Sequence, residues 1–143
     1  MTADPVGVAE RDRRLMKRVD ELAAEAGRAG NTAVGTIVVQ GEHILAEAKE
    51  ETPKGPDPFA HAELVAVRRA MAAAGRRHLQ GATLYTNVEP CFLCSYAIRE
   101  ARIGWVVIGR PTPEVGGVSS RYPLLTADDI ERWGRAPEVV WLE

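Results

Sequence analysis

The chain contains only two cysteines, Cys91 and Cys94, and just two residues, Phe92 and Leu93, separate them. Upstream lies the run His61-Ala62-Glu63. Two thiols and one imidazole are the kinds of ligand that zinc prefers, and a catalytic zinc keeps three protein ligands and leaves its fourth position to water. Glu63 then remains as a carboxylate that is free to move protons. These residue types predict a catalytic metal centre.

The spacing predicts that the starts of two helices carry these ligands. Proline favours the first turn of a helix, so Pro90 is expected to open a helix that holds Cys91 and Cys94, at i and i+3, on one face. A helix N-terminus and a metal both lower thiol pKa values, so both sulfurs are expected to bind as thiolates. His61 begins a second apolar-periodic run, which is entered from a proline-containing loop at 56–58.

Four stretches of the chain carry a resemblance to a known family. In order they are Asp57–Glu63, Gly81–Tyr85, Glu89–Cys94 and Ala101–Gly104. With Cys91 placed 28 positions after Glu63, the chain resembles the cytidine deaminase superfamily, and within it the branch that holds bacterial guanine deaminases and tRNA adenosine deaminases. The joint occurrence of these stretches is specific, although each one alone is weak.

The resemblance implies a hydrolytic deaminase with Zn²⁺ as its cofactor, bound by His61, Cys91 and Cys94. Such a zinc lowers the pKa of its water to about 7. Glu63 is expected to take the water proton, donate it to a ring nitrogen beside the attacked carbon, and help to protonate the departing amine. Ammonia is then the leaving product.

Six residues are expected to contact the substrate: Ala62, Glu50, Phe59, Glu89, Pro90 and Glu114. The resemblance implies that the Ala62 backbone N–H binds a ring substituent and that main-chain groups beside Pro90 meet the leaving amine. Glu50 stands where the resembled branch has an asparagine, and a carboxylate only accepts hydrogen bonds, so it favours a ligand edge rich in N–H donors. Alternatively, Glu50 and Glu51 form a solvated acidic pair, and Phe59 packs in the core instead of stacking on a ring.

The charge pattern favours a small substrate. The formal net charge is −2 and the pI is near 6.0, and no dense cationic run lies near the pocket segments. We therefore expect a nucleobase-like free base as the partner (guanine, a cytosine-like pyrimidine or an amino-triazine) and no nucleic acid. The alternative within the family is tRNA adenosine-to-inosine deamination. Alternatives of another class are a redox C-x-x-C protein and a non-catalytic zinc-binding module.

The periodicity predicts an α/β fold, a three-layer α/β/α arrangement with a mixed five-stranded sheet. Helices are expected at 11–29, after His61, after Pro90 and at 126–133, where Thr126 or Asp128 would form the cap. Strands are expected at 33–40 and 43–48, as a hairpin, and at 83–86, 105–108 and 138–142. Helical crossovers predict that the last three strands are parallel.

Composition agrees with one globular domain. The chain has 143 residues, of which 45% are hydrophobic and 27% are charged, so residues 1–143 are expected to form a single zinc-dependent deaminase domain. No apolar run suits a membrane span and no signal peptide is visible, so a cytoplasmic location and no membrane partner are expected. The resemblance also implies a homodimer in which residues 116–143 contribute to a neighbour's pocket.

Overall fold

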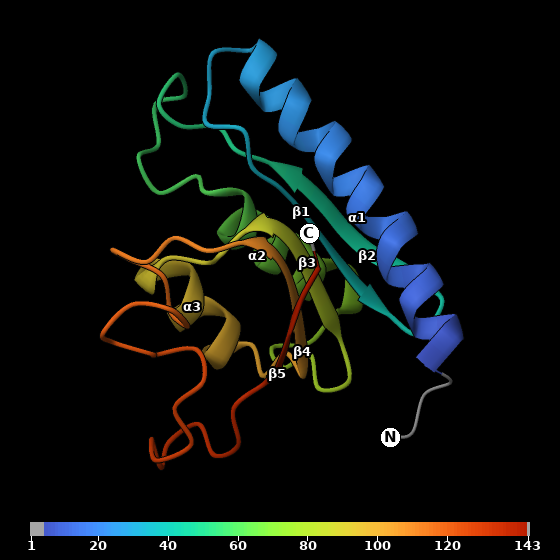
Figure 1. The fold of residues 1–143 in the computed structure, drawn as a ribbon, viewed down its shortest axis with the longest axis vertical. Coiled ribbons are helices and arrows are strands. Elements are labelled where there is room, and N and C mark those ends of the chain that lie inside the picture. Colours follow the sequence, from blue (N-terminus) through green and yellow to red (C-terminus); the bar gives the residue numbers. More distant parts are fainter. Residues whose placement is uncertain (1–4, 143) are drawn as a thin grey trace.

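The structure, a computed structural model, describes residues 5–142 and the side chains from residue 10 onward. Its centre is a five-stranded sheet in the order β2-β1-β3-β4-β5 (Figure 1). The strands are β1 (Gly35–Gln40), β2 (His43–Lys49), β3 (Thr83–Val88), β4 (Trp105–Arg110) and β5 (Glu138–Trp141). β1 pairs antiparallel with both β2 and β3, whereas β3, β4 and β5 are parallel. The predicted mixed sheet is confirmed.

Three helices cover the two faces of this sheet: α1 (Pro5–Arg28), α2 (Ala62–Ala74) and α3 (Phe92–Glu100). Alternate residues of a strand point to opposite faces, so a strand contributes side chains to a hydrophobic core on each face of the sheet. On one face Ile37 and Tyr85 pack against the α1 stripe that contains Val19. On the other face Val38 and Leu84 belong to the core shared with α2 and α3. Figure 1 shows α1 apart from α2 and α3, as the expected three-layer α/β/α fold requires.

Buried polar contacts fix α1 and β1 against β3. The Tyr85 hydroxyl donates to Asp12 Oδ1 at 2.6 Å, and both residues are buried. The Asn87 side chain accepts from the Gly35 N–H and donates to the Ala33 carbonyl, each at 2.9 Å. Gly35 itself must be glycine, because a Cβ there would lie 2.4 Å from the Val19 carbonyl oxygen. These contacts set the carboxyl end of β3, from which the site begins.

The helix predicted at 126–133 is wrong, because this segment forms turns. Arginines bind carbonyls at the end of this segment and on either side of it: Arg102 donates to the carbonyls of residues 132 and 133, and Arg99 to those of the flanking residues 124, 125 and 134. Asp128, one of the two expected caps, accepts from the Ala136 N–H instead. The parallel pairing of β4 and β5 therefore forms without a helical crossover.

Candidate metal centre and active site

The carboxyl end of β3 delivers the two cysteines. Cys91 is the N-cap of α3, with φ −71° and ψ 179°, and Cys94 lies in the first turn. Pro90 therefore precedes the helix, and the expectation that it opens the helix is wrong. Residue 91 is held extended by an antiparallel bridge to Gly116, and the Pro90 carbonyl accepts from the Gly117 N–H at 2.9 Å. The i, i+3 spacing still turns both sulfurs toward the same space.

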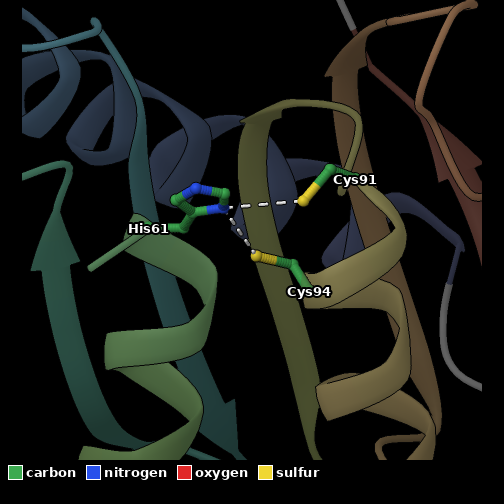
Figure 2. Close-up of side chains that lie close together, drawn as sticks. All are labelled: His61, Cys91 and Cys94. Atoms are coloured by element: carbon green, nitrogen blue, oxygen red, sulfur yellow. Dashed lines mark hydrogen bonds between the residues drawn. The ribbon is translucent and has the colours of Figure 1, made fainter. Parts of the chain in front are cut away.

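His61 completes the cluster from the start of α2, where it forms the N-cap. Its Nδ1 lies 3.5 Å from Cys91 Sγ and 3.5 Å from Cys94 Sγ, and Figure 2 shows the three side chains converging. A tetrahedral zinc separates nitrogen and sulfur ligands by about 3.6 Å, as follows from its usual bond lengths. The three donor atoms all lie within 4.8 Å of one another. The donor set and its spacing thus fit zinc.

The two thiols differ in acidity. A hydrogen bond from Cys94 and the neighbouring His61 lower the pKa of the Cys91 thiol to about 5, although its burial opposes this. The pKa of the Cys94 thiol is raised, first by its bond to Cys91 and then by burial. The bond between the thiols therefore favours the thiolate at Cys91, and because metal ligands must be deprotonated, zinc binding would release the proton that the pair still shares.

Glu63 lies in the first turn of α2 and is only 5% exposed. It is not one of the three residues of the cluster. Burial raises its pKa to about 8, and the negative charges of Cys91 and Glu50 add to the effect, while its own backbone N–H lowers it. A carboxyl group with this pKa exchanges a proton near neutral pH.

Glu50 and Ala62, two expected substrate contacts, bind each other. Glu50 Oε1 accepts from the Ala62 N–H at 2.9 Å, and the Thr52 hydroxyl donates to Oε2. Glu50 is buried, so it is not part of a solvated acidic pair; Glu51 is the exposed member and lies 3.9 Å from Arg69. The Glu50 carboxylate thus anchors the first amide of α2, between the metal ligand and the buried glutamate.

Glu89 is buried, and four donors from one loop engage its carboxylate. Oε1 accepts from the Thr112 N–H and the Ser119 hydroxyl, and Oε2 accepts from the N–H groups of Val118 and Ser119, at distances of 2.5–2.8 Å. Burial opposes ionisation, but these bonds prevail and lower its pKa. Both oxygens serve the loop, so the structure reassigns this carboxylate from the pocket to the loop.

The remaining expected contacts lie on surface loops. Phe59 is 60% exposed, so the alternative that it packs in the core is wrong. The Phe59 carbonyl accepts from the His61 N–H at 2.8 Å, so Phe59 lies beside the cluster. Glu114 is exposed on the loop that follows β4. The other histidines, His43 and His78, are exposed and belong to no ligand cluster among residues 5–142.

Solved structures with the same architecture point to deaminases. A structure described in a study of A-to-I editing by tRNA:A34 deaminases matches with a TM-score of 0.82 and 30% identity, over 90% of this chain and 91% of that one. The guanine deaminase of Bacillus subtilis matches with a TM-score of 0.66 and 35% identity, over 69% of this chain and 64% of that one.

Sequence comparison agrees with the structural matches. The tRNA-specific adenosine deaminase of Aquifex aeolicus is 35% identical over 72% of this chain and 68% of that protein. Two Deinococcus tRNA(Ile)-lysidine synthases also match, but this chain spans only 22% of each. The family model for the cytidine and deoxycytidylate deaminase zinc-binding region matches residues 9–110. With its zinc-type ligands in this arrangement, the chain belongs to the cytidine and deoxycytidylate deaminase family.

Proposed function

We propose that the chain is a zinc-dependent hydrolytic deaminase that converts adenosine to inosine in tRNA. The observation that carries the proposal is the convergence of His61, Cys91 and Cys94 beside a buried glutamate that is not a ligand. The printed names of its relatives and of a structure with a TM-score of 0.82 support tRNA as the substrate. This replaces the free base that charge and composition favoured.

Each residue has a distinct part in the proposed reaction. His61, Cys91 and Cys94 hold the metal, and zinc, when bound, supplies a water that deprotonates near neutral pH. Glu63 accepts the proton of that water and donates it to the ring nitrogen next to the carbon under attack. It then helps to protonate the departing amine, so that adenine and water yield hypoxanthine and ammonia. A pKa raised to about 8 by burial suits a group that both takes and returns a proton.

Glu50 acts in this proposal as a positioning residue. It binds the amide that lies between His61 and Glu63, and so holds the metal ligand and the proton shuttle in one geometry. A carboxylate at a helix N-terminus is favourable, because the helix dipole is positive there. The cost is a second buried negative charge beside Glu63, which adds to the rise of that glutamate's pKa.

A free base such as guanine is the second candidate substrate. The similarity to the guanine deaminase of Bacillus subtilis is consistent with this choice. Both candidates need the same metal and the same proton shuttle, so only turnover separates them.

The test is a comparison of substrates with the zinc-loaded protein. An anticodon stem-loop RNA with a single loop adenosine is compared with guanine, cytosine, an amino-triazine and free adenosine, and ammonia and inosine are measured. Glu63→Gln serves as the inactive control that keeps the ligands. Fastest turnover on the RNA supports the proposal, and fastest turnover on guanine supports the second candidate. If none of these substrates releases ammonia, a non-catalytic zinc-binding module is the better interpretation.

We also propose that residues 1–143 act as one domain and that the protein forms a homodimer. Leu93 and Tyr96 are 38% and 47% exposed on the outer side of α3, and Tyr122 nearby is 60% exposed. Such a group of apolar side chains is typical of a protein interface. Light scattering should give a mass twice that of one chain, and the Tyr96→Glu variant should have the mass of a single chain.

No helix in residues 5–142 is long and apolar enough to cross a membrane.

A further inference from the structure

A groove with a volume of about 520 Å³ lies beside α1, away from the metal-binding face. We call it the cationic groove, and eight residues line it: Arg13, Met16, Lys17, Asp20, Asn87, Gly109, Arg110 and Leu142. α1 is the only helix among residues 5–142 that covers this face of the sheet, so the space next to it over β4 stays open. The groove plays no part in the chemistry described above.

Three basic residues and one acidic residue are among those that line the cationic groove. Arg13 and Lys17 are four residues apart on α1 and so lie on one side of it. Arg110 ends β4, and all three cations are exposed. In the described part of the chain none of them is in an ion pair, whereas Arg18 on the same helix is paired with glutamates. With Asp20 as the one acidic residue in the lining, the groove carries a formal charge of +2, from three cations and one anion.

The groove opens at the same edge of the sheet as the metal centre. Arg110 pairs with Val88 in the parallel register, and its carbonyl accepts from the Glu89 N–H at 2.8 Å. Cys91 follows Val88 by three residues, so roughly 10 Å of extended chain separates the two positions. Asn87 and Gly109 place the groove on the face covered by α1, and Arg110 lies at the carboxyl edge that the groove shares with the metal centre. A flexible polymer that crosses this edge reaches both.

We propose that the cationic groove binds the phosphate backbone of an RNA substrate whose target base enters the metal centre. This inference rests on the proposed tRNA activity and specifies where the rest of the RNA binds. Arginine presents a planar fork of donors that matches phosphate, and lysine adds a point charge. Contacts of this kind supply affinity and register, while the pocket selects the base. A free base carries no phosphate and gains nothing from the groove.

The chain's net charge of −2 does not oppose this inference. Charges on the far side of the molecule are screened over about 8–10 Å at physiological salt, so a local cluster determines what binds beside it. The sequence hides the cluster, because Arg13 and Lys17 precede Arg110 by more than ninety positions and only the fold unites them.

The test compares RNA binding by the wild-type protein and by the triple variant R13Q/K17Q/R110Q, both zinc-loaded. A fluorescein-labelled anticodon stem-loop RNA is titrated by anisotropy at several salt concentrations. Removing three phosphate contacts should lower the slope of log affinity against log salt by about 2–3. At fixed moderate salt the dissociation constant should rise roughly tenfold to a hundredfold. Turnover of the best free base or nucleoside should stay unchanged, because no groove residue touches the metal ligands.

The matched control is R14Q/R28Q/R77Q, which removes the same charge from exposed arginines outside the groove. Equal slopes for the two triple variants would overturn the inference, and so would a wild-type protein that shows no salt-dependent RNA binding. If the groove variant alone loses RNA affinity but the wild type forms no inosine, the groove stands and the proposed tRNA activity fails. If inosine forms in RNA and the groove variant binds normally, the activity stands and the groove is rejected.

Discussion

Replacing Glu63 with glutamine should change how the metal-free protein's stability responds to pH. Burial raises the pKa of Glu63 from its ordinary value of 4.5 to about 8. The folded protein therefore keeps a proton that the unfolded chain loses. Its stabilising effect is full below the unfolded pKa and declines as pH rises toward the folded pKa. Glu63→Gln has the same shape and does not titrate, so it lacks this decline.

Linkage gives the size of the effect. Between pH 5 and pH 8 the wild-type free energy of unfolding should fall by about 3–4 kcal/mol relative to that of Glu63→Gln. Both proteins keep the cysteines and His61, so the substitution changes only the group at position 63. The amide should therefore stabilise the metal-free protein most at the higher pH. With zinc bound the difference should shrink, because a nearby dication favours the carboxylate.

The assay is urea unfolding followed by circular dichroism, with chelator and reductant present, at several pH values from 5 to 8. Glu51→Gln is the matched control, because that glutamate is exposed and should give a profile parallel to the wild type. Parallel profiles for the wild type and Glu63→Gln would refute the reasoning, since Glu63 would then be an ordinary ionised glutamate. The proposed role of Glu63 as a proton shuttle could then no longer be based on a raised pKa.

Three further substitutions test separate contacts. Cys91→Ala should reduce the zinc content, measured by mass spectrometry, from about one ion per chain, whereas the exposed-residue control His43→Ala should keep it. Glu50→Ala should cost about 1–3 kcal/mol of unfolding free energy by leaving the Ala62 N–H unpaired, and Glu50→Gln should cost less because it keeps an oxygen for that amide. Glu89→Gln should destabilise the protein by a similar amount, since its NH₂ must face donors, and this difference should disappear as pH falls through the lowered pKa of Glu89.

The five strands and the three residues of the candidate metal site were predictable from the sequence. The unbroken apolar run of β1 and the i, i+3 cysteines report directly on local geometry, and the structure places a buried strand and a helix start at these positions. Contacts made at a distance were not predictable. Asp128 resembles a helix cap, but its partner is the amide of Ala136, and Arg102 binds the carbonyls of residues 132 and 133. Local propensity lost to tertiary hydrogen bonds at this segment.

The substrate contacts were harder to predict than the ligands for a similar reason. A ligand set is read from residue type and spacing, whereas a pocket wall depends on which oxygens remain free after folding. Glu50 and Glu89 are carboxylates near the cluster, and in both the oxygens are engaged by other parts of the chain. The net charge did not predict that Arg13 and Arg110 line one groove, because a net charge contains no information about where the charges lie.

The anchoring of a whole loop by one carboxylate divides that loop into fixed and variable parts. Glu89 binds mainly backbone N–H groups, so the path of the loop does not depend on most of its side chains. Gly116 cannot change, because a Cβ there would lie 2.1 Å from Glu89 Oε2. Residues 113–115 are all exposed and bear no such constraint. Randomising these three positions should therefore spare the scaffold, and natural selection has the same freedom.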